Sequence, residues 1–222
     1  MSEWWTYGLA DFLLFSPRTY ARLFALYNEA LWPAQPLVAL GWLALFAALW
    51  RKARWAPPAV LLALALAWGW VAWAFHLQRY ATINWAAPWF AAAFGAQALL
   101  LALAARGVRR AEPVPAVAWW LLGAGGLGLP LLGPALGQPW IETEGFGLTP
   151  DATVLGSLGV LRMFVPAYRL VWRIWWLVPL SWSIVGSLTL WALGEPLRAL
   201  LLPLASILVA IAHWQCRYKC AH

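Results

Sequence analysis

Seven apolar stretches constrain what this chain can fold into, because each approaches the length of a bilayer-spanning helix. A helix needs about 20 mainly apolar residues to cross the hydrocarbon core. The fifth stretch is the weakest, since Arg162 and Pro166 interrupt it, and a short or re-entrant segment is the alternative there. The stretches cover 33–50, 57–77, 85–105, 114–137, 152–168, 174–193 and 197–214.

The composition indicates that lipid is the main solvent. Hydrophobic residues make up 64% of the 222 residues and charged residues 10%, whereas a soluble domain carries about 25% charged residues. We therefore predict an all-α fold, a polytopic transmembrane helical bundle of six or seven spans, with the lipid bilayer as its main partner. Many of the 20 Trp residues stand near the ends of apolar runs. This is typical of aromatic belts at the headgroup level, and an aromatic cage for a cation is the alternative.

The basic residues gather in alternate loops. Eleven of the 15 fall on one predicted side, in the segments 51–54, 106–110 and 162–173 and in the tail, while seven of the eight acids fall on the other side. Because short basic loops stay in the cytoplasm, this pattern places the N-terminus outside and the C-terminus in the cytoplasm. The net charge of +7 is then a topology signal, and no nucleic-acid partner is expected.

The segment before the first span has a different pattern. In "FSPRTYARLFALYNEALW", Ser16 suits an N-cap and Pro17 the first helical position, and apolar and charged residues follow on opposite faces. Such an amphipathic helix is expected to lie flat in the outer interface, and a lid folded over the bundle is the alternative. The expected organisation is an interfacial segment 1–32, a transmembrane domain 33–214 and a cytoplasmic tail 215–222.

Two connections on the predicted outer side supply the first candidate site. "FHLQRYATINW" brings a histidine and an arginine to the end of the second span, and "QPWIETEGFGLTPD" carries three acids and no base. Together they would suit an anionic ligand or, through carboxylates and an imidazole, a metal cation or acid–base chemistry. Interfacial snorkelling and a solvated acidic loop are the plainer alternatives. The candidate residues are His76, Arg79, Tyr80, Asn84, Glu142, Glu144 and Asp151.

The C-terminal tail supplies a candidate metal site. "HWQCRYKCAH" offers His213, Cys216, Cys220 and His222, whose thiolates and imidazoles would suit zinc or copper(I). The second pair is poorly spaced for zinc, so reduced cytosolic thiols beside basic residues are the alternative. The cofactor, if the chain has one, stays unknown at this stage.

The fourth apolar stretch contains "GAGGLG". This matches a dinucleotide-binding pattern but lacks the preceding strand that such a site needs, and its small residues favour close helix packing instead. Pro130 and Pro134 in the same stretch should kink or break the helix. A broken helix can expose backbone groups to a substrate.

Three classes of function remain open. The sequence favours a transporter or channel for a small solute or ion first, because of the broken fourth span and the polar outer face; the accessory role is its alternative. Small-residue packing favours a non-catalytic accessory or structural subunit of a larger membrane complex, or a homo-oligomer. A membrane enzyme that uses His76 with the outer acids ranks last. No carboxylate or lysine lies near the middle of any predicted span, which disfavours a proton pump.

Three stretches of the chain resemble one known family. They are "SEWWTYGLADFLLFSPRTYARLFALYN" (2–28), "RYATINWAAPWFAAAF" (79–94) and "FGLTPDATVLGSLGVL" (146–161). They are similar to bacterial multi-pass membrane proteins grouped as domain of unknown function 6064. The resemblance implies a bacterial inner-membrane protein of this size, and it implies no established activity, cofactor or catalytic residue.

The third of these stretches departs from the family it resembles. There the family commonly reads Thr-Pro-Cys-Pro, whereas this chain has Thr149, Pro150, Asp151 and Ala152. If the cysteine serves thiol chemistry in the relatives, this chain has the hard carboxylate of Asp151 in its place. We expect a structural corner first: Thr149 or Asp151 caps the next helix, and the glycines that follow allow close packing below it.

Overall fold

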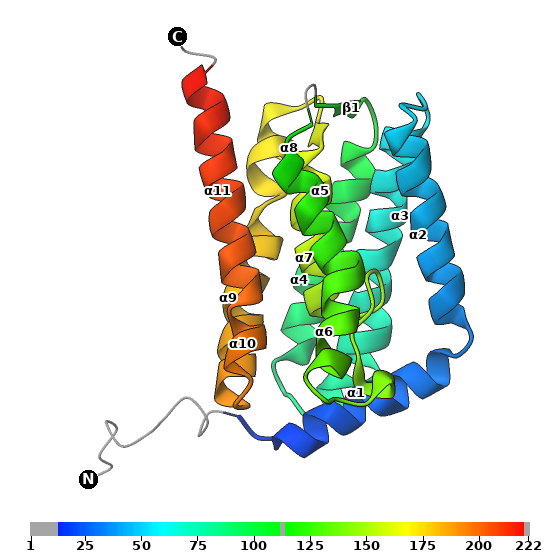
Figure 1. The fold of residues 1–222 in the computed structure, drawn as a ribbon, viewed down its shortest axis with the longest axis vertical. Helices are drawn as coiled ribbons and strands as arrows, with labels where there is room; N and C mark the ends of the chain where they lie inside the picture. Colours follow the sequence, from blue (N-terminus) through cyan, green and yellow to red (C-terminus); the bar gives the residue numbers. More distant parts are fainter. Residues whose placement is uncertain (1–12, 112–113, 220–222) are drawn as a thin grey trace.

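The computed structural model describes residues 13–111 and 114–219, with side chains described as far as residue 212 apart from Arg169. Its helices run up and down beside one another, and α1 (Pro17–Leu31) lies across one end of them (Figure 1). Within the described ranges the strands are limited to one antiparallel pair, β1 (Arg109–Arg110) with β2 (Phe164–Val165). The predicted all-α class is confirmed.

The remaining elements follow the apolar pattern of the sequence. Two of them, η3 and η5, are π-helical turns that continue α-helices, and η4 and η6 are short 3₁₀ turns. In chain order they are α2 (Ala34–Trp50), α3 (Ala56–Trp70), η3 (Val71–Leu77), η4 (Tyr80–Thr82), α4 (Ala87–Ala104), α5 (Ala116–Gly123), η5 (Ala124–Gly128), α6 (Leu129–Ala135), η6 (Trp140–Glu142), α7 (Pro150–Arg162), α8 (Arg169–Ile174), α9 (Leu177–Ala192), α10 (Pro196–Ala199) and α11 (Leu201–Lys219).

Four helical segments are long and apolar enough to cross a membrane. They are Ala56–Thr82, Ala87–Ala104, Ala116–Ala135 and Leu170–Ala192. A fifth is reached if α1 and α2, which meet at an angle of 80°, are taken as one broken span, and Pro196–Ala212 is a shorter apolar helix. The count of six or seven spans stays a prediction.

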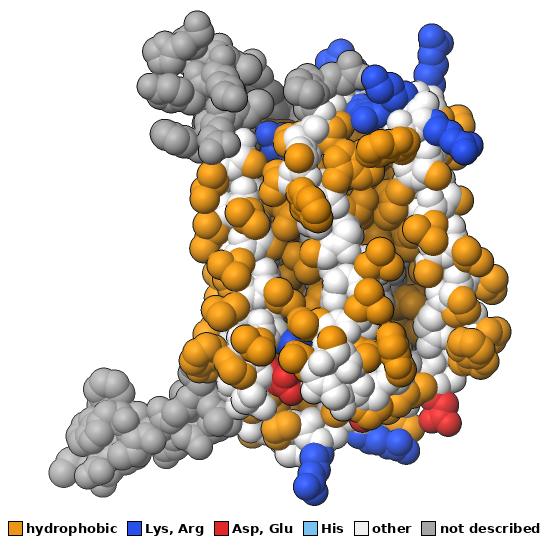
Figure 2. Space-filling model, viewed as in Figure 1, with side chains coloured by type: hydrophobic (Ala, Val, Ile, Leu, Met, Phe, Trp, Pro, Cys, Tyr) orange, Lys and Arg blue, Asp and Glu red, His pale blue; other side chains and the backbone are white. Residues whose placement is uncertain are grey.

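The two ends of the bundle differ in charge. Figure 2 shows Lys and Arg gathered at the end that carries β1, an apolar middle, and the acidic side chains at the end that carries α1, where some basic side chains also lie. We call the first the basic end, formed by the connections 51–55, 105–111, 114–115 and 163–168, and the second the acidic end, formed by α1 and the connections 136–149 and 193–200. The structure thus separates the loops as the sequence pattern does.

Helix α7 is the innermost element. Every residue from Pro150 to Leu161 is buried, and the helix contacts α3, α5, η5, α9 and α11. Its 13 residues give a length of about 20 Å, well short of the roughly 30 Å hydrocarbon core. The weak fifth stretch therefore forms a short helix that ends at Arg162, which is the alternative left open for it.

Glycines allow the close approach around α7. A methyl group at Gly125 of η5 would overlap the backbone of Gly156, and one at Gly159 would lie 2.5 Å from the carbonyl oxygen of Ala118. The predicted close packing is confirmed at these glycines, whereas a methyl group at Gly123 or Gly126 of the fourth stretch would meet no atom within 4 Å. The predicted disturbance at the prolines takes the form of the π-helical turn η5, directly before Pro130, within a helix that runs on from Ala116 to Ala135.

Helix α1 is fastened to the bundle. Its N-cap is Ser16, whose Oγ accepts a 3.2 Å hydrogen bond from the Thr19 N–H, as predicted. On its inner face the Tyr27 hydroxyl donates to the Leu148 carbonyl at 2.8 Å, and Asn28 Nδ2 donates to the carbonyls of Ile141 and Thr143 at 2.7 and 2.8 Å. Helix α1 thus lies folded over one end of the bundle, and its position flat in the outer interface stays a prediction.

Candidate functional site at the acidic end

Glu144 joins two segments at the acidic end. Its Oε1 lies 2.7 Å from Nη2 of Arg198 in α10. Its Oε2 accepts hydrogen bonds of 3.2 Å from the backbone N–H of Ala152, in the first turn of α7, and from the Thr149 hydroxyl. Negative charge is stabilising at a helix N-terminus, so Glu144 caps α7 from outside the helix.

The capping residue differs from the one predicted. Thr149 occupies the N-cap position of α7, but its hydroxyl bonds back to the backbone of Gly145 and not to the helix. Asp151 is bonded to another helix, as described below. The prediction that one of these two side chains caps α7 is therefore wrong. The Glu144 carboxylate, eight residues before Ala152 in the chain, accepts the hydrogen bond from the free N–H instead.

Arg198 is held by further polar groups. Its Nη1 donates to Gln138 Oε1 at 3.4 Å, and Gln138 Nε2 donates to Glu195 Oε1 at 3.2 Å. The side chain of Arg198 is 11% exposed and that of Glu144 is 2% exposed. Removing one member of such a buried pair leaves the other charge uncompensated, so α10 and α7 depend on each other here.

Asp151 binds a third helix. Its Oδ1 accepts a 2.7 Å hydrogen bond from Trp182 Nε1 of α9. Gly186 makes room for this contact, since a methyl group there would lie 2.9 Å from the same oxygen. Burial raises the pKa of the Asp151 carboxyl above its ordinary value, and the nearby Glu144 carboxylate raises it further. Asp151 is thus a buried acid that holds a proton more tightly than a free one.

His76 lies beside this group without bonding to it. The side chain is fully buried in the π-helical turn η3, and neither ring nitrogen has a hydrogen-bond partner among the described residues. Its ring centroid lies 4.6 Å from that of Phe94 and 5.0 Å from that of Trp182. Trp182 therefore touches His76 with its ring while its Nε1 donates to Asp151.

The other predicted residues are spread around these contacts. Tyr80 is buried against the rings of His76 and Phe90. Asn84 Oδ1 accepts a 2.9 Å hydrogen bond from the Ala86 N–H, a local contact just before α4. The Arg79 carbonyl accepts from the Thr82 hydroxyl at 2.7 Å, within the same turn.

A small crevice leads toward the ion pair. Its volume is about 40 Å³, and Tyr20, Gln138, Glu142, Glu195 and Arg198 are among its lining residues. A water molecule takes up about 30 Å³ in the liquid, so the crevice has room for little more than one. Of the predicted site, Glu142 is at this opening, while Glu144 and Asp151 lie buried behind it.

Metal binding finds no support among the described residues. Among the described residues no three His, Cys, Asp or Glu side chains are grouped so that they could hold a metal ion. The tail candidates His213, Cys216, Cys220 and His222 lie outside the described side chains, so that part of the prediction stands as it was.

Several residues of the acidic-end network were absent from the predicted site: Gln138, Thr149, Trp182, Glu195 and Arg198. Arg198 of α10 meets Glu144 in the loop before α7 only in the folded chain. Trp182 of α9 likewise meets Asp151 in the first turn of α7. One signal was available for Trp182: Gly186 follows it by four positions, so a small residue shares its helix face. For Arg198 the available signal was a single basic residue among apolar neighbours in the chain.

The comparisons place the chain in a family. The family described as "Family of unknown function (DUF6064)" matches residues 18–219, nearly the whole chain, and the chain therefore belongs to it. No curated protein and no solved structure matches the chain.

Proposed function

We propose that this member of the DUF6064 family is an integral membrane protein with a non-catalytic role, an accessory or structural subunit of a larger membrane complex. Four helical segments long and apolar enough to cross a membrane support the membrane location. The proposed setting is the bacterial inner membrane, with the basic end in the cytoplasm and the acidic end outside. The separation of charge between the ends supports that orientation.

The observation that carries the accessory role is the closed interior around α7. Two polar side chains of this helix bond within the protein. Trp68 Nε1 donates to Ser157 Oγ at 2.9 Å, Ser157 Oγ donates to the Thr153 carbonyl, and Thr153 Oγ1 accepts from the Gly147 N–H at 3.0 Å. Satisfied interhelical hydrogen bonds of this kind hold membrane helices together. A substrate path would leave such groups facing water.

Transport is the second candidate, and His76 is the observation that favours it. A buried side chain with two unpaired nitrogens is costly to keep, and ionisable groups at membrane depth often mark ion pathways. Neither the crevice at the acidic end nor a larger groove beside α2 is lined by Gln97 or by residues of Ala116–Ala135, and Gln97 is itself buried and donates to the Trp175 carbonyl at 2.8 Å.

Native mass measurement tests the accessory role. The tagged chain is expressed at its native level in its host, extracted in a mild detergent and weighed intact by mass spectrometry. We expect a reproducible species that contains other polypeptides in fixed ratio. A chain that is released alone or only with copies of itself, and that conducts a solute in proteoliposomes, would overturn the proposal.

Reporter fusions test the proposed orientation. Alkaline phosphatase fused after Gly137, at the acidic end, should be active because this enzyme folds outside the cytoplasm. The same fusion after Gly107, at the basic end, is the matched control and should be inactive. The opposite pattern would reverse the orientation.

A further inference from the structure

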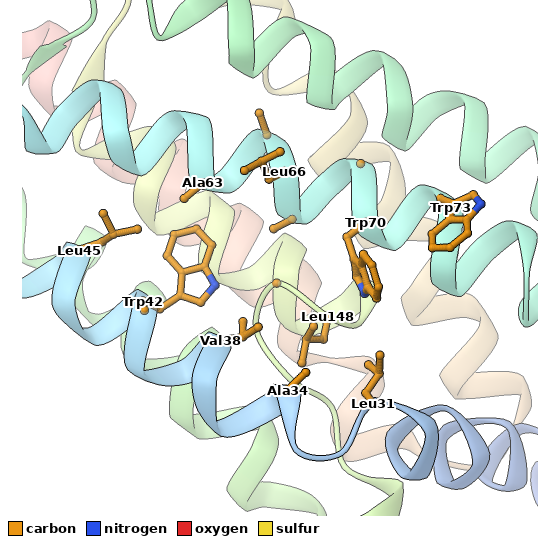
Figure 3. A pocket seen from close by; sticks show the side chains of 15 residues that line it. Leu31, Ala34, Val38, Trp42, Leu45, Ala63, Leu66, Trp70, Trp73 and Leu148 are labelled. Carbon is orange, nitrogen blue, oxygen red and sulfur yellow. The ribbon is translucent and has the colours of Figure 1, made fainter.

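A groove runs between α2 and α3 on one side of the bundle (Figure 3). Val38, Trp42 and Leu45 line it from α2, Leu66 and Trp70 line it from α3, and Leu148 closes its floor. Its volume is about 760 Å³, and none of its lining residues carries a charge. Pockets for small ligands span about 300–1,000 Å³ and are mostly apolar, so the groove has the size and the chemistry of a binding site for an apolar molecule.

The groove exists because α2 stands away from the bundle. Only Trp42 and Leu49 of this helix are buried, and Trp42 reaches across to Phe146, with ring centroids 4.6 Å apart. Small residues such as Gly41 and Ala63 leave the space between the two helices unfilled. A methyl group added at Gly41 would meet no atom within 4 Å.

The position of the groove matches one leaflet of a bilayer. From Ala34 to Leu45 it follows α2 for about 17 Å, close to half of the roughly 30 Å hydrocarbon core. It starts at the junction of α1 and α2, at the acidic end. Leu66 and Trp73 on its rim are 76% and 54% exposed, so the groove opens sideways, toward lipid.

We propose that this groove binds one hydrocarbon chain of a membrane lipid from the leaflet at the acidic end. The absence of charge among its lining residues complements an uncharged hydrocarbon chain. A transmembrane helix of a partner is too thick for it: a helix about 10 Å wide takes up roughly 1,200 Å³ over a length of 15 Å. Trp70 and Trp73 lie toward the acidic end of the groove, where indole rings favour the headgroup level.

Photo-crosslinking tests the lipid site. The full chain is reconstituted in vesicles of phosphatidylcholine doped with an analogue that carries a diazirine in one acyl chain, and the labelled peptides are located by mass spectrometry after illumination. We expect adducts concentrated severalfold in residues 34–45 and 63–73 over other lipid-facing helices. Adducts spread evenly over all exposed apolar helices would overturn the proposal.

Two glycine variants sharpen the test. Gly41→Phe should fill the groove and lower the labelling of 34–45 and 63–73 severalfold. Gly95→Phe is the matched control, since a side chain there also meets no atom within 4 Å but Gly95 is not part of the groove, and its labelling should stay unchanged. A melting temperature equal to that of the native chain shows that each variant has folded.

Two further outcomes would count against the site. Unchanged labelling in Gly41→Phe would contradict it, and so would crosslinks from α2 to another polypeptide in native membranes in place of lipid. The site does not rest on the accessory role. The position of the lipid adducts tests the lipid site, and the native mass tests the accessory role. Either proposal can therefore fail alone.

Discussion

Glu144 and Arg198 stand 54 residues apart in the chain and form a 2.7 Å ion pair at the N-terminus of α7. The pair ties the connection before α7 to the short helix α10, while the second oxygen of Glu144 caps α7 itself. One carboxylate therefore fixes the start of the innermost helix and the turn between α9 and α11. The acidic end of the bundle is organised around this contact.

Breaking the ion pair should destabilise the fold. Arg198→Ala leaves the Glu144 carboxylate buried without its partner, and the expected loss of unfolding free energy is about 3–5 kcal/mol. The loss is measured by denaturant unfolding in detergent micelles. Arg22→Ala, at an exposed position of α1, is the control and should change little. An equally small loss in Arg198→Ala would show that the pair is not structural.

Asp151 should make stability depend on pH. Its pKa in the folded chain is raised by burial above the ordinary value of about 3.9, so the folded state holds the proton more tightly than the unfolded state. The stabilising contribution is fully present below about pH 4 and is lost as the pH rises through the folded-state pKa.

Asp151→Asn tests this dependence. The variant has no proton to lose and should keep its melting temperature more nearly constant between acidic and neutral pH than the native chain does. The Trp182 N–H can still donate to the amide oxygen, so the comparison keeps the hydrogen bond. Identical pH profiles for the two proteins would contradict the assignment.

The glycine contact between η5 and α7 should tolerate no side chain. Gly125→Ala places a methyl group against the backbone of Gly156, and overpacking of this kind costs about 1–3 kcal/mol. Gly126→Ala is the matched control one residue away, because a methyl group there meets no atom within 4 Å. Thermal unfolding compares the two, and equal melting temperatures would mean that the helices separate easily.

Replacing His76 by Phe should stabilise the protein. The change keeps an aromatic side chain among the rings of Phe94 and Trp182 and removes two unpaired nitrogens, whose burial costs about 1–3 kcal/mol. Trp68→Phe is the contrast, since it removes the donor to Ser157 and should destabilise. A lower melting temperature in His76→Phe would indicate that the imidazole has a partner in the membrane-bound protein.

The local features of the fold could be predicted from the sequence, and the contacts between distant residues could not. Ser16 and Pro17 marked the start of α1, because the cap of this helix forms within its own first turn. The glycines of the fourth stretch and of α7 indicated close packing, because small side chains allow it wherever the partner lies. The partner of Glu144 was not predictable, since it depends on how α10 folds back onto α7.

The burial of α7 inside the bundle also could not be predicted from the sequence. Its apolar residues indicate burial but not whether lipid or protein surrounds them, and only the neighbouring helices decide between the two. Of the neighbours predicted for His76, the structure places Tyr80 beside it. Its separation from the carboxylates depends on Trp182, which contacts both His76 and Asp151. Sequence patterns locate polar residues along the chain, whereas their pairing is set by tertiary packing.

Reagent access to the middle of α7 tests the closed interior most directly. Ser157 is fully buried, and Ser157→Cys in a chain with Cys216 and Cys220 replaced by Ser gives a single thiol there. In right-side-out and inverted membrane vesicles, a charged maleimide should leave position 157 unlabelled from either side. The control Glu142→Cys, at the crevice of the acidic end, should be labelled from one side. Labelling of position 157 as fast as position 142 would reveal a water path beside α7 and contradict the account.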